Sequence, residues 1–262
     1  MNKISNICME AGMGILYLVV PCYNEEEVLP ESSRIMRQKI VNLIGAGKIS
    51  PESRVMFVDD GSTDGTWSIL HKLCQENANI DAVKLSRNRG HQNALMAGLV
   101  TAIKYSDFTI SMDADLQDDI DAIDEMIEKY EEGAEIVCGV RRSRTTDSFL
   151  KSSTAHAFYS LMNMFGARVI YDHADFRLMS SEAVRRLCRY GTEDLFIRGL
   201  ITRLNLPLEK VKYDRLPRLA GESKYTLRKM LHLAARGFSC SKMKPSGDMQ
   251  VGELYIERVE HG

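Results

Sequence analysis

Short apolar runs alternate with segments of helical periodicity through the first half of the chain. The apolar runs are typical of strands buried on both faces of a parallel sheet. They cover residues 15–20, 54–58, 82–85, 108–112 and 135–140. The helical segments between them cover residues 28–44, 67–73, 92–104 and 120–130. This order predicts an α/β fold, with an open, mostly parallel sheet flanked by helices.

The second half of the chain has a looser pattern. We expect helices at residues 153–165 and 181–190, and then a basic loop before an amphipathic helix at residues 225–238. The chain therefore divides into a disordered leader, one main domain, the amphipathic helix and a loosely ordered tail. These four parts cover residues 1–14, 15–224, 225–238 and 239–262.

The composition is that of an ordinary globular protein, with 44% hydrophobic and 27% charged residues. Lys and Arg total 34 against 36 Asp and Glu, so we expect no nucleic-acid partner. The longest apolar run, residues 15–20, is far shorter than the roughly 20 residues of a membrane-spanning helix. The six cysteines lack the spacing of a metal site, so we expect reduced thiols. Neither a P-loop nor a G-x-S-x-G motif occurs.

Polar residues cluster where three of the predicted strands end. The carboxyl ends of parallel strands share one edge of the sheet, and ligands bind at this edge in open α/β proteins. The clusters are Pro21, Tyr23 and Glu25; Asp59, Asp60 and Ser62; and Asp113, Asp115 and Gln117. We therefore expect these residues to converge on one site.

Asp113 and Asp115 form the most informative cluster. Two carboxylates at i and i+2 leave the strand in the same direction, and the following turn brings Gln117 near them. Oxygen ligands of this kind suit Mg²⁺ or Mn²⁺, with phosphate oxygens of a nucleotide completing the coordination. The alternative is a pair of solvated acids that precede an acidic helix.

The other two clusters also have structural alternatives. Asp59 and Asp60 can accept hydrogen bonds from a nucleotide base or a ribose, or they can form an Asx-type turn that caps a helix. Tyr23 and Glu25 can contact a ligand, or they can belong to an exposed loop that enters the first helix.

Six motifs in this order resemble those of family 2 glycosyltransferases. They lie at residues 20–25, 58–64, 85–93, 112–118, 175–179 and 218–224, within a resemblance that covers about residues 15–238. The most similar branch contains the polyprenyl-phosphate sugar transferases, such as dolichol-phosphate mannose synthase and bactoprenol glucosyltransferase. The resemblance implies a GT-A fold over residues 15–224 and a nucleotide-sugar donor bound with a divalent metal, Mg²⁺ or Mn²⁺.

The resemblance also assigns roles to individual residues. Those that match the binding site of the nucleotide's base and ribose are Pro21, Tyr23, Glu25 and Asp60, next to Asp59. Those that match the metal and diphosphate site are Asp113, Asp115 and Gln117. Those that match basic groups near the donor diphosphate and the lipid phosphate are Arg141, Arg177, Arg218 and Lys224. Among all of these, Asp113, Asp115 and the three arginines are the expected catalytic residues, although any single arginine can instead be a surface cation.

A lipid phosphate is already anionic at neutral pH, so it can attack an anomeric carbon without a strong general base. It needs charge neutralisation and alignment, which guanidinium groups provide. Direct displacement would invert the anomeric centre.

The predicted helix at residues 225–238 carries an apolar stripe beside a basic stripe. Such a helix can lie on an anionic membrane surface, or it can pack on a core with its charged face in water. The resemblance favours the membrane surface, because a polyprenyl acceptor stays in the bilayer. Bacterial members of this branch usually continue into two transmembrane helices, whereas residues 239–262 are polar. Either the chain is truncated or altered relative to this branch, or it works as a peripheral protein, and we expect it at the cytoplasmic face of the cell membrane.

The expected function is metal-dependent, inverting transfer of a hexose onto a polyprenyl phosphate. The expected donor is UDP-glucose, and GDP-mannose is its alternative. One competing function is transfer to a soluble hydroxyl acceptor in polysaccharide synthesis, for which Glu193 or Asp194 would supply the base. Another is nucleotide-sugar binding by a catalytically impaired protein. A homo-oligomer is compatible with the sequence.

Overall fold

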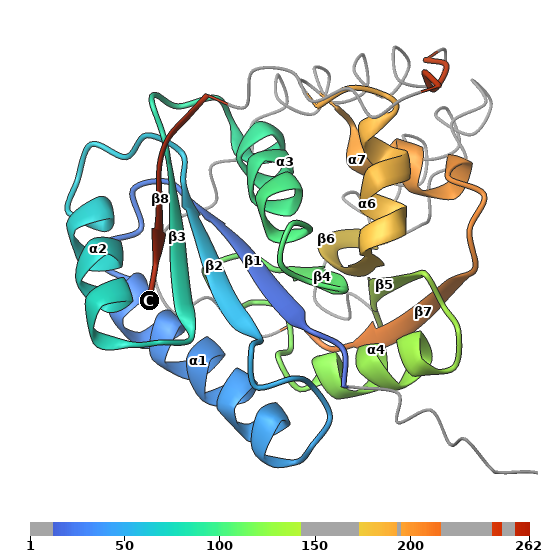
Figure 1. The fold of residues 1–262 in the computed structure, drawn as a ribbon, viewed down its shortest axis with the longest axis horizontal. Coiled ribbons are helices and arrows are strands. Elements are labelled where there is room, and N and C mark those ends of the chain that lie inside the picture. Colours follow the sequence, from blue (N-terminus) through green and yellow to red (C-terminus); the bar gives the residue numbers. More distant parts are fainter. Residues whose placement is uncertain (1–12, 143–172, 193–194, 216–242, 248–254) are drawn as a thin grey trace, which may run out of the picture.

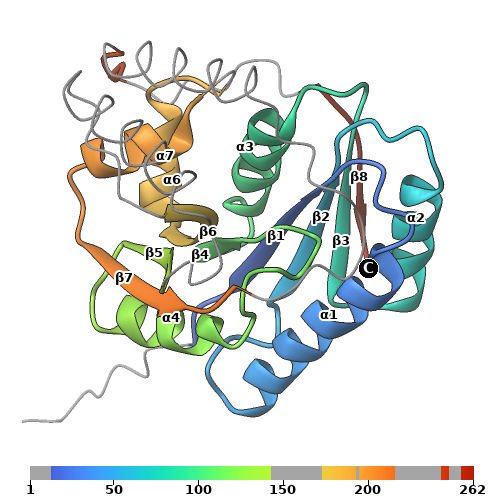
Figure 2. The same ribbon diagram turned by 180° about the vertical axis from the view of Figure 1, so that it is seen from behind.

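The computed structural model describes residues 13–142, 173–192, 195–215, 243–247 and 255–262. Within these residues the strands are β1 (Leu16–Cys22), β2 (Arg54–Asp59), β3 (Ile80–Leu85), β4 (Phe108–Ser111), β5 (Ile136–Arg141), β6 (His173–Ser180), β7 (Leu208–Tyr213) and β8 (Ile256–His261). They form one twisted sheet in the order β7-β5-β6-β4-β1-β2-β3-β8, with helices on both faces (Figure 1, Figure 2).

The described helices are α1 (Leu29–Gly45), α2 (Thr66–Glu76), α3 (His91–Ala102), α4 (Ala122–Glu131), α6 (Ser181–Cys188) and α7 (Ile197–Leu200), followed by the 3-10 helix η1 (Ile201–Arg203). α1, α2 and α4 cover one face of the sheet, and α3, α6 and α7 cover the other. None of these helices has the length and apolar character that a membrane span requires.

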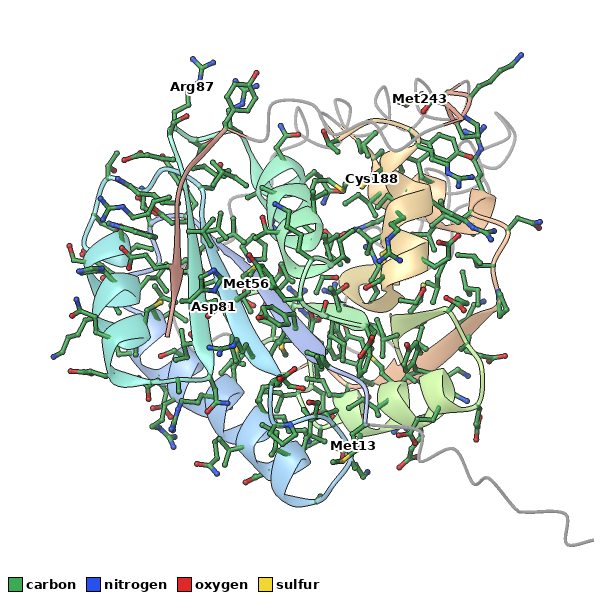
Figure 3. The ribbon with its side chains drawn as sticks, viewed as in Figure 1. Met13, Met56, Asp81, Arg87, Cys188 and Met243 are labelled. Carbon is green, nitrogen blue, oxygen red and sulfur yellow. The ribbon has the colours of Figure 1, made fainter. Side chains whose placement is uncertain are left out.

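Each face of the sheet has its own hydrophobic core. Successive residues of β1 alternate between the two, so that Leu18 packs with α1 and α4 while Val19 packs with α3. Met56 of β2, labelled in Figure 3, belongs to the α3 side. This double burial explains why the first strands have continuous apolar sequences.

The strand directions confirm the mostly parallel α/β sheet. β1 is parallel to β2 and β4, β2 is parallel to β3, and β5 is parallel to β7. β6 is antiparallel to both β4 and β5, and β8 is antiparallel to β3 at one edge. The apolar pattern did not predict β6, β7 or β8, because β6 includes buried charged residues and the other two are edge strands.

The first strand continues through a proline that was expected to end it. The carbonyl of Cys22 accepts the N–H of Asp60 on the β2 side, and the carbonyl of Val19 accepts the N–H of Met112 on the β4 side. Because backbone groups alternate in direction, the nitrogen of Pro21 faces the β4 side. The ladder with β4 ends at Val19, so the missing N–H of Pro21 breaks no strand pairing.

The C-terminal tail differs from the prediction. Residues 256–261 form β8 and pair with residues 81–85 of β3, whereas residues 239–262 were expected to be loosely ordered. An edge strand has a neighbour on one side only, which permits the polar sequence of β8. The predicted helix at 181–190 corresponds to α6, which ends at Cys188. The predicted helices at 153–165 and 225–238 and almost all of the leader lie outside the described residues.

Candidate active site

A pocket of about 230 Å³ opens at the carboxyl ends of β1, β2 and β4, beside the N-terminus of α3. The residues from the three expected clusters that line it are Pro21, Tyr23, Glu25, Asp60, Asp113 and Asp115. Asn88, Gly90 and His91 contribute the wall next to α3. The fold therefore brings the three clusters to one site, as the strand order predicts.

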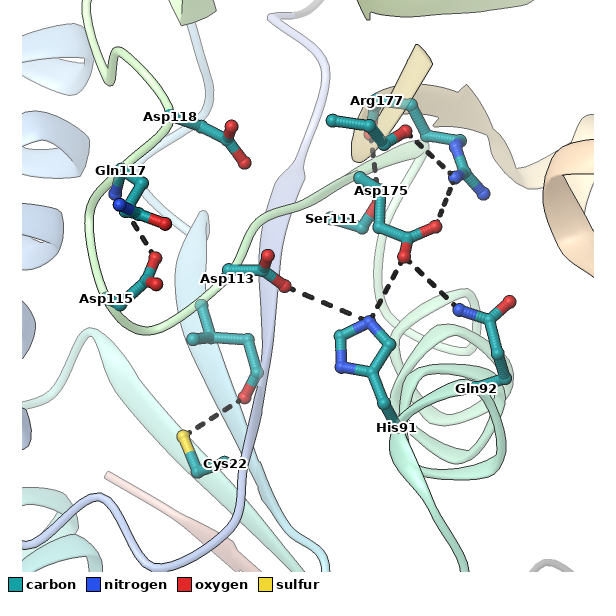
Figure 4. A network of polar contacts seen from close by, with 12 residues as sticks. Cys22, His91, Gln92, Ser111, Asp113, Asp115, Gln117, Asp118, Asp175 and Arg177 are labelled. Carbon is teal, nitrogen blue, oxygen red and sulfur yellow. Dashed lines mark hydrogen bonds and ion pairs between the residues drawn. The ribbon is translucent and has the colours of Figure 1, made fainter. Parts of the chain in front are cut away.

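Asp113 and Asp115 follow β4 in a tight turn of the chain, the acidic loop (residues 112–118). The residues that follow each of them, Ala114 and Leu116, are buried, and Leu116 adopts a left-handed φ of 51°. The Asp115 carboxylate accepts the backbone N–H of Gln117 at 3.2 Å, while the Asp113 side chain is 45% exposed. The apolar residues anchor this loop, and the two carboxylates line the pocket (Figure 4).

The next two residues of the acidic loop do not line the pocket. The amide oxygen of Gln117 accepts a hydrogen bond from Arg215. Asp118 is buried, accepts the Tyr213 hydroxyl hydrogen bond at 2.5 Å and lies 3.6 Å from Arg141. Burial is the main cause that raises the pKa of Asp118 to about 6. The backbone of Gln117 therefore stays beside Asp115, while its side-chain amide bonds Arg215 and does not line the pocket.

Next to His91 of the pocket wall, the buried Asp175 accepts several hydrogen bonds. Arg177 Nη2 and Arg198 Nη2 each donate to it at 2.7 Å, and Arg198 Nε donates at 3.1 Å. His91 Nε2 lies 3.3 Å from Asp175 and 3.8 Å from Asp113, so the imidazole ring lies between these two carboxylates (Figure 4). Burial alone would raise the pKa of Asp175, but Arg198, His91 and Arg177 hold it well below its usual range.

The two acids at the end of β2 have different roles. Both oxygens of Asp60 accept backbone N–H groups, from Arg89 at 2.7 Å and from Gly90 at 2.9 Å. Asp59 is fully buried and accepts the N–H of Ser62 at 3.1 Å. Because neighbouring residues of a strand point in opposite directions, only Asp60 reaches the pocket. Asp59 is therefore corrected from a ligand-binding candidate to the structural alternative, an Asx-type turn.

Tyr23 and Glu25 lie in a loop that is tied to the loop after β2. Between them, Asn24 adopts a left-handed φ of 52°. Its backbone N–H donates to Ser62 Oγ at 2.9 Å, and its side chain accepts the N–H of Thr63 at 2.9 Å. The Tyr23 side chain remains 38% exposed at the rim of the pocket. This loop is thus an ordered wall of the site.

The predicted basic residues lie behind the pocket where the structure describes them. Arg177 is 1% exposed and bound to Asp175, and Arg141 is 20% exposed beside Asp118 and Tyr213. Neither of these arginines lines the pocket. The other predicted phosphate-binding residues and the alternative general bases lie outside the described residues: Arg218, Lys224, Glu193 and Asp194.

Comparison with known proteins identifies the family. Residues 17–188, more than half of the chain, match the family described as Glycosyl transferase family 2. The chain belongs to this family. It is therefore a glycosyltransferase, as the order of its six motifs predicts.

Known proteins of similar sequence align with most of the length of this family 2 glycosyltransferase. The uncharacterized glycosyltransferase YkoT of Bacillus subtilis is 46% identical over 237 residues, which cover 90% of this chain and 70% of that protein. The bactoprenol glucosyl transferase of Shigella phage SfV is 36% identical over 224 residues, which cover 85% of this chain and 70% of that protein.

A solved structure confirms the fold class. Glucosyl-3-phosphoglycerate synthase from Mycobacterium tuberculosis, crystallised with Mn²⁺, UDP-glucose and phosphoglyceric acid, aligns with a TM-score of 0.58 at 19% identity. The alignment covers 90% of this chain and 83% of that one. The predicted GT-A fold is therefore confirmed.

Sequence reasoning gave no role to three residues that build one side of the site. His91 and Asp175 lie within two of the six motifs, at residues 85–93 and 175–179, and this placement is the signal that could have found them. Arg198 lies in an otherwise apolar stretch without such a signal, and only the fold brings it to Asp175.

Asp113 and Asp115 suit a divalent cation. Both present carboxylate oxygens at the pocket, and oxygen ligands are those that Mg²⁺ and Mn²⁺ prefer. Gln117 is held by Arg215 and does not line the pocket. Among the described residues, no group of three His, Cys, Asp or Glu side chains forms a metal site on its own. The two carboxylates therefore fit a site that bound substrate oxygens would complete.

Proposed function

We propose that this family 2 glycosyltransferase moves glucose from UDP-glucose onto a polyprenyl phosphate at the cytoplasmic face of the cell membrane. The observation that carries the proposal is a single pocket in which Asp113 and Asp115 lie with Tyr23, Glu25 and Asp60. Paired carboxylates with an aromatic and polar wall suit a nucleotide diphosphate bound with a cation.

The relatives support this choice of donor and acceptor. The Shigella phage SfV relative is named as a bactoprenol glucosyl transferase, and bactoprenol phosphate is a polyprenyl phosphate. The structurally similar synthase was crystallised with UDP-glucose and Mn²⁺. We propose the same class of donor and acceptor for this chain.

Asp113 and Asp115 are the residues that would hold Mg²⁺ or Mn²⁺. When bound, such a cation acts as a Lewis acid that neutralises the leaving diphosphate. The chain itself keeps both carboxylates in place, because Ala114 and Leu116 are buried beside them. Pro21, which also lines the pocket, would contact the nucleotide.

Two of the four predicted basic residues would act on the phosphate groups of the reaction, and the other two would support the site. Arg218 and Lys224 are the proposed phosphate ligands. Arg177, which is buried, would act by holding Asp175. Arg141 would support the acidic loop through Asp118, at 3.6 Å.

The proposed reaction needs no strong base. A non-bridging oxygen of the lipid phosphate forms a bond to the anomeric carbon while the bond from that carbon to the UDP diphosphate oxygen breaks. The phosphate is already anionic, so no proton has to be removed. Attack opposite the leaving group inverts the anomeric centre.

A panel of radiolabelled nucleotide sugars tests the proposal. The purified chain is incubated with polyprenyl phosphate in detergent and with Mg²⁺ or Mn²⁺, and the label in the lipid fraction is counted. We expect transfer from UDP-glucose. Transfer only from GDP-mannose would change the donor and keep the acceptor. Transfer from UDP-glucose to a soluble sugar but never to lipid phosphate would contradict the proposal.

A further inference from the structure

One wall of the pocket is a loop whose outer side contacts the last described segment of the chain. This loop, residues 86–90, joins β3 to α3 and contributes Asn88 and Gly90 to the pocket lining. Arg87 lies at its outer end, next to the upper end of β8 (Figure 3). The position of this loop therefore affects the shape of the pocket.

On its inner side, the 86–90 loop is held by the end of β2. The two oxygens of Asp60 accept the N–H groups of Arg89 and Gly90. The next residue, Gly61, has a φ of 66°, and a Cβ atom there would lie 2.4 Å from the carbonyl carbon of Arg87. Only glycine permits this approach, so the loop and the end of β2 fit closely together.

On its outer side, the 86–90 loop is held by Tyr255. The Tyr255 carbonyl accepts the N–H of Ser86 at 2.9 Å. The Arg89 guanidinium carbon lies 3.6 Å from the centre of the Tyr255 ring, and that of Arg87 lies 5.8 Å from it. Both distances are within the range of an attractive cation–π contact. The aromatic ring thus contacts the residue whose backbone N–H is bound to Asp60.

The backbone at Tyr255 departs from regular strand geometry. Tyr255 has a left-handed φ of 55°, which costs energy for a bulky residue. The pairing of β3 with β8 also shifts register between Lys84 and Leu85, directly before the loop. A regular edge strand would show neither irregularity. Both occur where the ring and the carbonyl of Tyr255 meet the loop.

We propose that Tyr255 is a positioning residue for the nucleotide-sugar donor. It holds the 86–90 loop from behind, so that Asn88 and Gly90 keep their places in the pocket. This inference rests on the proposed function, because the pocket is taken as the donor site. Loss of the Tyr255 ring is expected to weaken donor binding more than it slows the chemical step.

Three variants separate the effect of the Tyr255 ring from the effects of the Tyr255 backbone and of strand β8. Tyr255→Asn removes the ring, and asparagine still tolerates a left-handed φ. Tyr255→Phe keeps the ring. Glu257→Gln is the matched control, since Glu257 lies two residues after Tyr255, on β8, and bonds Lys84 instead of the loop. For each variant we would measure the Kd of UDP with Mn²⁺, the KM and kcat for UDP-glucose, hydrogen exchange of residues 86–91, and Tm.

For Tyr255→Asn we expect the Kd of UDP and the KM to rise about five-fold, with a smaller change in kcat. Exchange at Arg89 and Gly90 is expected to accelerate. Tyr255→Phe and Glu257→Gln are expected to match the wild-type chain in all four measurements.

Unchanged exchange at residues 86–91 in Tyr255→Asn would overturn the inference. So would faster exchange spread over β3 and β8 with a lower Tm, because it would show general support of the sheet. Faster loop exchange with unchanged UDP affinity would also overturn the donor-positioning role. If the wild-type chain binds no UDP with Mn²⁺, the proposed donor is wrong, and the exchange data still decide whether Tyr255 holds the loop.

Discussion

Asp118 and Asp175 are buried carboxylates beside the pocket, and their pKa values shift in opposite directions. Burial raises the pKa of Asp118 to about 6. The pKa of Asp175 lies well below its usual range although burial opposes this shift. The two residues are 2% and 8% exposed, so the degree of burial does not explain the difference.

The neighbouring charges explain it: Asp113 and Asp115 repel the Asp118 carboxylate, and the two residues differ in the number and distance of their cations. Asp118 has one guanidinium, Arg141, at 3.6 Å, and an uncharged hydroxyl donor. Asp175 has two guanidinium groups at 2.7 Å and His91 at 3.3 Å. A buried carboxylate keeps its charge only when cations and donors replace the lost water. The negative charge of Asp118 is therefore poorly compensated, whereas the negative charge of Asp175 is compensated by its neighbouring cations.

The largest expected effect is on the acidic loop. Asp115→Asn should lower transfer by about a thousand-fold, because it removes one of the two carboxylates that would hold the cation. Activity is measured as label transferred to lipid phosphate. Asp121→Asn is the matched control, since Asp121 belongs to the same acidic segment and is 84% exposed. Near-normal turnover of Asp115→Asn would show that this carboxylate is not needed.

The same substitution on the two buried acids should give different stabilities. Asp175→Asn should lower the free energy of unfolding by about 3–5 kcal/mol, because it leaves Arg177 and Arg198 without their carboxylate. Asp118→Asn should stay within about 1 kcal/mol of wild type, because it removes a charge that burial disfavours. Urea unfolding at pH 7 measures both. Equal losses of unfolding free energy in the two variants would show that the cations around Asp175 do not make its carboxylate more stabilising than that of Asp118.

The Tyr213 hydroxyl is the closest described donor to Asp118. Tyr213→Phe should lower the free energy of unfolding by about 2 kcal/mol at pH 7, because the Asp118 carboxylate then loses this donor. In the Asp118→Asn background the same change should cost less. Equal costs in both backgrounds would mean that the hydroxyl acts independently of Asp118.

The pH dependence of stability should show the smallest effect. A carboxyl whose pKa is raised on folding costs stability above that pKa, and the cost shrinks as pH falls from the folded pKa towards the unfolded one. Between pH 7 and pH 5, wild type should therefore gain about 1 kcal/mol relative to Asp118→Asn. The stability advantage of wild type over Asp175→Asn should grow as pH falls through this window. Burial lowers the pKa of His91, but the hydrogen bond to Asp175 raises it overall, and the substitution removes the carboxylate that favours the charged imidazole. A stability difference between wild type and Asp118→Asn that does not change between pH 7 and pH 5 would contradict the raised pKa of Asp118.

The hydrophobic pattern of the sequence predicts the acidic side of the site, whereas it does not predict the Asp175 side. Asp113 and Asp115 follow an apolar strand directly, so the strand end alone places them at the sheet edge. Asp175 and Arg177 interrupt the hydrophobic pattern of β6, and they are buried because they bond each other and Arg198. Periodicity measures burial of apolar side chains, so it misses a strand whose buried residues are ion pairs.

The same reasoning explains the other differences in the fold. The alternating apolar runs correctly predicted β1 to β5, since those strands are covered on both faces. β8 is a polar edge strand whose place depends on contacts with β3, far away in the sequence. Asp59 and Asp60 are adjacent acids, and only the direction of the strand tells which one reaches the pocket.

The insertion of β6 between β4 and β5 has a consequence for folding. β5 and β7 connect to the rest of the sheet only through β6 in the described strand order. β5 ends at Arg141 and β6 begins at His173, so β5 has to wait for a later part of the chain before it can dock. Closing such a distant contact is slow relative to local pairing. We expect β1, β2 and β3 to gain protection early in refolding, and β5 and β7 to gain it together, no sooner than β6.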